Sequence, residues 1–82
     1  MDNAVIRLTA RETDVLQLMA RGHTYSQIGD ALGVSLHTVA SHAKNIYFKF
    51  EVHTARAAVW RAIELRLLDL AEDMHSVQLE RQ

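Results

Sequence analysis

The chain of 82 residues contains no cysteine, no proline and only three glycines. Without thiols it forms no disulfide bond, thiolate zinc site or iron–sulfur cluster, and it has no cysteine nucleophile. No apolar run approaches the roughly 18 residues that a membrane span needs, and no secretory signal opens the sequence. Few turn residues and an ordinary hydrophobic content of 49% favour one small all-α domain. We therefore expect a cytoplasmic protein without a membrane partner.

Charge is nearly balanced over the whole chain, with a formal net charge of -1. Residues 1–68 carry eight basic and six acidic residues, a net of +2, whereas residues 69–82 carry one basic and four acidic residues, a net of -3. The net charge of the whole chain therefore does not indicate the charge of residues 1–68, which is positive. We expect one domain over residues 1–68 and an acidic C-terminal extension over residues 69–82, either a helical continuation or a frayed tail.

Two capping boxes predict the first two helices. T-A-R-E at 9–12 and T-Y-S-Q at 24–27 each place a threonine three residues before a Glu or Gln. Gly22 and Gly33 follow the two apolar-periodic segments and suit the left-handed position that ends a helix. The predicted helices span about 10–21 and 25–32.

The third predicted helix spans 36–50, and its two faces differ in chemistry. Gly33-Val34-Ser35 joins it to the short helix before it, as in a helix-turn-helix. Apolar residues at 39, 43, 46 and 50 form a core stripe at helical spacing. The opposite face carries His37, Ala40, Ser41, Lys44 and Phe48, with Asn45 and Lys49 at its edges. No acidic residue occurs from 36 through 50. A helix of this kind fits the major groove of DNA.

Thr54 caps a fourth predicted helix, about 55–70. Small residues at 55, 58 and 62 give it a core face. A second apolar stripe recurs every three or four residues, at Trp60, Ile63, Leu67, Leu70, Met74 and Val77. We hypothesise that the helix continues to about Met74 and that this stripe mediates self-association. The alternative is that Trp60 and Ile63 cover the small core while the C-terminal residues 69–82 fray.

The sequence from about Leu8 to Leu68 resembles the LuxR-type (LuxR/FixJ) helix-turn-helix domain of bacterial transcription regulators. The matching segments recur in order: L-T-A-R-E-T-D-V-L at 8–16, G-H-T-Y-S-Q-I at 22–28, L-G-V-S-L-H-T-V-A-S-H at 32–42, K-N-I-Y-F-K-F-E-V at 44–52 and A-A-V at 57–59. Two departures matter: Ala40 stands where a lysine is common, and Arg66 replaces a glycine that often ends the fourth helix.

The resemblance implies a four-helix domain whose third helix enters the major groove, bound to double-stranded DNA as a dimer held partly by the fourth helix. RNA polymerase is a candidate further partner. Many relatives carry an N-terminal receiver or ligand-binding domain, and a few are free-standing. The expected base-reading residues are Ala40, Ser41 and Lys44. The expected contacts to the DNA backbone are Tyr25, Ser26, Thr38, Asn45 and Lys49. The expected dimer interface is Trp60, Ile63, Leu67 and Leu70.

We expect no enzymatic activity, metal site or cofactor. His37 and His42 are five residues apart, which does not bring two imidazoles to one helix face. No glycine-rich phosphate loop and no distinctive catalytic set is present. A sigma-factor promoter-reading domain matches the 37–52 pattern less well. The alternative in a different class is a protein-interaction module with weakened DNA contacts, which Ala40 and the net charge favour slightly.

Overall fold

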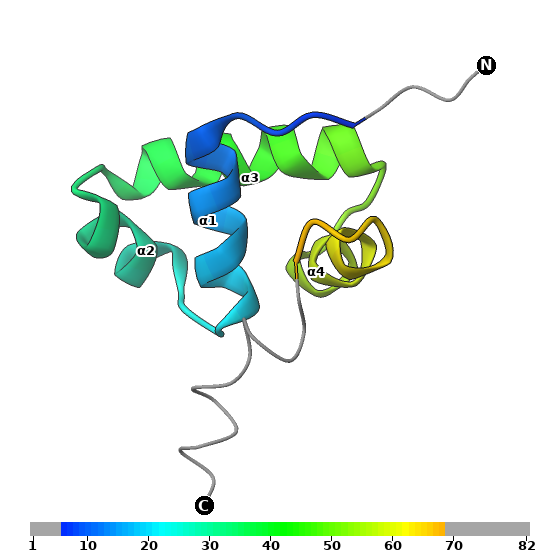
Figure 1. Ribbon diagram of the computed structural model, residues 1–82. Coiled ribbons are helices and arrows are strands. Elements are labelled where there is room, and N and C mark those ends of the chain that lie inside the picture. Colours follow the sequence, from blue (N-terminus) through cyan, green and yellow to red (C-terminus); the bar gives the residue numbers. More distant parts are fainter. Residues whose placement is uncertain (1–5, 69–82) are drawn as a thin grey trace, which may run out of the picture.

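The computed structural model describes residues 6–68, which form four helices and, within that range, no strand: α1 (Ala10–Ala20), α2 (Tyr25–Leu32), α3 (Leu36–Phe50) and α4 (Ala55–Glu64). The predicted all-α class and the bounds of the second and third helices are confirmed. In Figure 1, α1 crosses α3, with α2 and α4 on either side of α1. Both α1 and α3 pack against each of the other three helices, so α3 is held in place from three directions.

Each helix begins with a side-chain cap. Thr9 accepts a hydrogen bond from the Glu12 amide while the Glu12 carboxylate accepts one from the Thr9 amide. Thr24 and Gln27 repeat this reciprocal pair at the start of α2. Ser35 and Thr54 cap α3 and α4 with their hydroxyl groups. The caps predicted at Thr9, Thr24 and Thr54 are confirmed, and each of the four caps satisfies an amide that has no partner within its helix.

Each helix also ends in the same way, with a residue of positive φ after its last turn: Gly22, Gly33, Glu51 and Arg66. The amide of the next residue then bonds back to a carbonyl five residues earlier, as in the Schellman motif. In α3 this bond joins the Val52 amide to the Tyr47 carbonyl at 3.0 Å. Glycine adopts this conformation without cost, but Glu51 and Arg66 do so with a Cβ atom.

The end of α4 corrects the prediction of a helix over 55–70. The helix ends at Glu64, and Arg66 turns the chain with a φ of 61°. The Arg66 amide bonds to the Ile63 carbonyl at 3.0 Å and the Leu67 amide to the Ala62 carbonyl at 2.8 Å. The turn also brings Leu68 into the core, where it is buried. These bonds and this burial offset the left-handed conformation of a non-glycine residue, so a helix stop forms without glycine. The expected continuation toward Met74 lies beyond Leu68, outside the described residues.

We expect Arg66→Gly to raise the free energy of unfolding by about 0.5–1 kcal/mol. Glycine relieves a left-handed strain of roughly 1–2 kcal/mol. Its greater conformational entropy in the unfolded chain offsets part of this stabilisation. Urea denaturation of the 82-residue chain measures the difference. Arg61→Gly, inside α4, is the matched control and should lose about 1 kcal/mol. Equal losses in both variants would contradict the assignment of strain to Arg66.

The core lies where the four helices meet, and among residues 6–68 Glu12 is its one buried charged or polar side chain. Its largest fully buried side chains are Val15, Leu16, Ile28, Val39, Ile46 and Phe50. The predicted α3 stripe at 39, 43, 46 and 50 is buried throughout, as are Ala58 and Ala62 of α4. No helix within residues 6–68 has the length and apolar character to cross a membrane.

Candidate nucleic-acid interface

The side of α3 opposite the core forms one continuous exposed surface. A helix turns by about 100° per residue, so His37, Ser41, Lys44 and Phe48 fall within an arc of about 60°, on the side opposite the buried stripe. All four are exposed. Ala40 and Asn45 flank this arc, Ala40 half-buried and Asn45 exposed. We call these six residues the α3 outer face.

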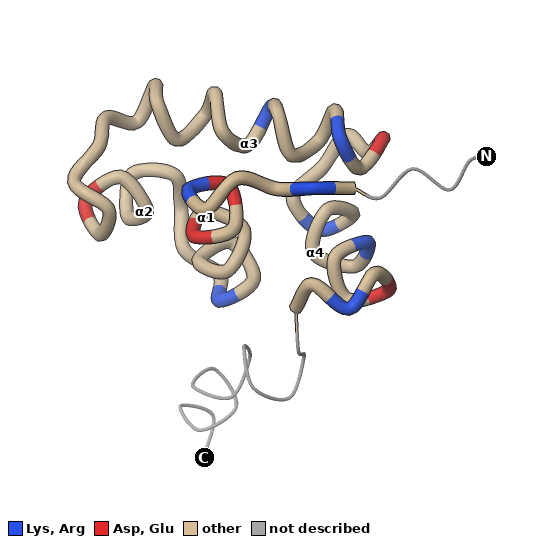
Figure 2. The backbone as a smooth tube through the Cα atoms, turned by 45° about the horizontal axis from the view of Figure 1, so that its top comes forward, with Lys and Arg blue, Asp and Glu red and all other residues tan. Residues whose placement is uncertain are grey.

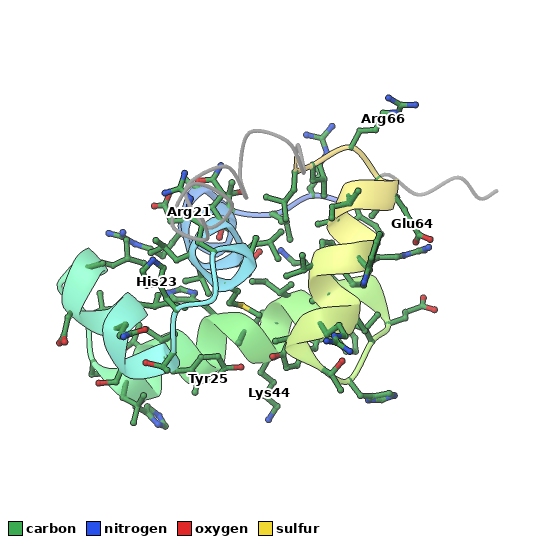
Figure 3. All side chains as sticks on the ribbon, turned by 90° about the horizontal axis from the view of Figure 1, so that it is seen from below. Arg21, His23, Tyr25, Lys44, Glu64 and Arg66 are labelled. Carbon is green, nitrogen blue, oxygen red and sulfur yellow. The ribbon has the colours of Figure 1, made fainter. Side chains whose placement is uncertain are left out.

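Positive charge on this face is not neutralised from within the helix. Figure 2 shows Lys44 and Lys49 as the basic positions of α3, with no acidic residue until Glu51, just past its end. No acidic side chain within residues 6–68 forms an ion pair with Lys44. In Figure 3 Lys44 points away from the body of the protein, while Arg66 lies on the opposite side. The Lys44 ammonium is thus available to an external acceptor.

The start of α2 adjoins the same side of the molecule. Tyr25, the first residue of α2, lies on the side of the molecule to which Lys44 points (Figure 3). Its hydroxyl lies 2.8 Å from the hydroxyl of Tyr47 on α3. Burial raises the pKa of Tyr47 well above its ordinary value, and the hydrogen bond to Tyr25 raises it further. Tyr47 therefore stays protonated, and the Tyr25 hydroxyl keeps capacity for a further hydrogen bond. The next residue, Ser26, is exposed.

Thr38 is hydrogen-bonded to Ser35, the residue that caps α3. Its hydroxyl lies 3.0 Å from the Ser35 hydroxyl, and its amide donates to the same oxygen at 3.0 Å. The side chain is half-buried. Its hydroxyl therefore has an internal partner in the free protein, and it can still donate to a phosphate when the Ser35 hydroxyl is the donor of that bond.

Lys49 has an internal role that the sequence did not indicate. Its ammonium lies 2.7 Å from the Glu12 carboxylate and donates to the Arg7 carbonyl at 2.9 Å. The Glu12 side chain is only 5% exposed and the Lys49 side chain 32%. Burial alone would raise the pKa of Glu12, but the hydrogen bonds from Lys49 and the Thr9 amide and the positive charge of Lys49 lower it below its ordinary value. This contact joins the start of α1 to the end of α3.

The expected dimer residues do not form one stripe. Trp60 is 58% exposed, so it is not the core residue that tryptophan usually is. Trp60 and Ile63 line a hollow between α4 and the end of α1, together with Met19, Ala20 and Val59. Leu67 follows the turn at Arg66 and lines a different hollow, beside Leu8 and Leu16. Leu70 lies outside the described residues.

Sequence reasoning missed two features of this region. The ion pair of Glu12 with Lys49 joins residues 37 positions apart, and nothing in the spacing of either helix signals such a contact. The left-handed turn at Arg66 was missed because the absence of glycine predicted a longer helix. An apolar Leu67-Leu68 pair at a short distance past the last turn was the available signal, since a buried residue there accompanies this type of stop.

Known proteins match most of the chain. Residues 7–62 match the family described as "Bacterial regulatory proteins, luxR family". Among curated relatives, the chain is 42% identical over 60 residues to "Transcriptional activator protein CarR" of Pectobacterium carotovorum subsp. carotovorum, covering 73% of this chain and 25% of that protein. It is 44% identical over 57 residues to "Transcriptional regulatory protein DegU" of Brevibacillus brevis, covering 70% of this chain and 24% of that protein.

A shorter relative is "Uncharacterized response regulatory protein YgeK" of Escherichia coli (strain K12), 37% identical over 59 residues that cover 72% of this chain and 40% of that protein. The matched part of the chain thus spans between a quarter and two fifths of the length of these relatives. By their names, these relatives are regulatory proteins.

Proposed function

This chain belongs to the luxR family of bacterial regulatory proteins, and on that premise we propose that it binds double-stranded DNA sequence-specifically and regulates transcription. The observation that carries the proposal is the α3 outer face: exposed, free of acidic residues and held by all three other helices. The major groove of B-DNA is wide enough to admit an α-helix. The site of action would then be the bacterial cytoplasm, with RNA polymerase as a further partner.

In this proposal, Ser41 and Lys44 read base edges. Lysine donates to the O6 and N7 acceptors of guanine, serine pairs with several bases, and Ala40 offers only apolar contact to a thymine methyl group. Tyr25, Ser26, Thr38 and Asn45 donate to phosphate oxygens on either side of the groove and set the register of α3. Lys49 is left out of this set because Glu12 and the Arg7 carbonyl already hold its ammonium.

Titration of the 82-residue chain with a random-sequence duplex tests DNA binding itself. Phosphate-driven affinity should appear at low salt and fall as salt rises, with a log–log slope of roughly -0.9 for each phosphate contacted. A selection from a random library should then give a preferred sequence with a higher affinity at the same salt. If the duplex does not bind even at low salt, the proposal is wrong, and the alternative of a protein-interaction module with weakened DNA contacts replaces it.

The proposal includes a homodimer formed through α4. Trp60 and Ile63 give α4 an apolar surface at the hollow between α4 and the end of α1. A dimer formed through this surface would leave the α3 outer face free to bind DNA. A symmetric contact of this kind would set two α3 helices on successive half-sites, about one helical turn of DNA apart. Leu67 is left out of this interface because the turn at Arg66 places it in the other hollow.

We expect Trp60→Glu to abolish self-association, because the change removes the apolar surface of the indole and places a carboxylate, which is costly to desolvate, between two α4 helices. Sedimentation velocity over a wide concentration range, with and without a two-half-site duplex, measures the effect. Leu65→Glu, another exposed apolar residue of the same region, should assemble as the wild type does. If wild type and Trp60→Glu bind the two half-sites with equal cooperativity, α4 is not the dimer interface.

A further inference from the structure

Phe48 is an unusual residue on the α3 outer face. With 83% of its surface exposed, it is the most exposed large apolar side chain within residues 6–68. Its neighbour Tyr47 turns toward α2 and bonds to Tyr25, so the adjacent aromatic residue already supplies the packing on that side. Phe48 therefore contributes little to the folded core, and its ring faces solvent.

The position of Phe48 on the helix places it among the proposed base-reading residues. It follows Lys44 by four residues and Ser41 by seven, so the three side chains project from nearly the same direction. At about 1.5 Å per residue, Phe48 lies about 6 Å beyond Lys44 along the helix axis. At about 3.4 Å of rise per base pair along the DNA axis, this separation spans at most roughly two base pairs.

Resting on the proposed function, we propose that Phe48 is a specificity-determining residue that contacts the 5-methyl group of a thymine about two base pairs from the one that Lys44 reads. A phenyl ring has no hydrogen-bonding group, and the thymine methyl is the apolar feature that base pairs present in the major groove. Contact between ring and methyl removes apolar surface of both from water. A protein partner is less favoured, because Phe48 shares its face with Lys44 and no acid.

Replacement of thymine by deoxyuridine tests the contact, because it removes the methyl group and leaves base pairing intact. Each thymine of the selected duplex is replaced in turn, and the affinities of wild type and Phe48→Ala are measured by fluorescence anisotropy. For wild type we expect a three- to tenfold loss at one thymine about two base pairs from the Lys44 position. For Phe48→Ala we expect a similar loss on the unmodified duplex and no further loss at that deoxyuridine.

Two controls separate this contact from other causes. Ala40→Gly removes the other apolar side chain of the outer face proposed to touch a thymine methyl, and it should retain sensitivity to the methyl near Phe48. Thermal unfolding of Phe48→Ala should match that of the wild type, since the ring is exposed.

The contact is overturned if Phe48→Ala keeps the wild-type loss at every deoxyuridine, or if no thymine near the Lys44 position shows a loss in the wild type. Failure of the wild type to bind any duplex would instead overturn the proposed function, so the two failures are distinguishable.

Discussion

Lys44→Ala is expected to weaken binding to the selected duplex by about 1–3 kcal/mol, or roughly 5- to 150-fold, and to relax the preference at one base pair. Lys44 projects from the centre of the α3 outer face, one turn beyond Ala40 and Ser41, and has no acidic partner within the described part of the chain. Affinity measurements on the selected duplex and on its single-base variants give both quantities.

The salt dependence then shows what Lys44 contacts. Loss of a base contact changes the sequence preference, whereas loss of a phosphate contact weakens all sequences alike and reduces the salt slope by about 1. Arg66→Gly removes one positive charge from the opposite side of the molecule and serves as the charge control, with affinity near that of wild type. An unchanged affinity and preference in Lys44→Ala would remove Lys44 from the base-reading set.

Lys49→Met is expected to lower the free energy of unfolding by about 1.5–3 kcal/mol, the range for a hydrogen bond to a charged group. The variant leaves Glu12 buried with the Thr9 amide but without its ammonium partner. Lys44→Met makes the same chemical change on the same helix, at a lysine that forms no ion pair with any of residues 6–68. It should stay within about 0.5 kcal/mol of wild type. Urea denaturation at neutral pH measures both variants.

The same contact predicts a pH dependence. Because the pKa of Glu12 is lowered in the folded protein, its contribution to stability is present above the ordinary value of 4.5 and is lost as pH falls through the lower folded value. Wild type should therefore lose stability below about pH 4.5 more steeply than Glu12→Gln does. Parallel curves for the two proteins, or equal losses in Lys49→Met and Lys44→Met, would contradict a stabilising role for the pair.

The sequence by itself determined the helices and their starts. Capping residues three positions before their partners, and glycines at 22 and 33, are local signals, because the groups that satisfy a helix end lie within one turn of it. The apolar stripe at 39, 43, 46 and 50 fixed which side of α3 is buried, and hence which side is exposed. The six residues of the α3 outer face could therefore be predicted, whereas Lys49, expected at its edge, is held by Glu12 instead. The role of this face in DNA binding remains a proposal.

Only the tertiary structure decided the features that depend on contacts distant in sequence. Lys49 and Phe48 are neighbours on a helix, yet Glu12 of α1 holds one of them while the other faces solvent. The end of α4 at Glu64 depends on the burial of Leu68 in a core built by all four helices, which allows Arg66 to take a conformation that its own residue type disfavours. Helical periodicity in the sequence predicts the side of a helix on which each residue lies. Whether another helix or solvent is found on that side is decided only by the tertiary structure.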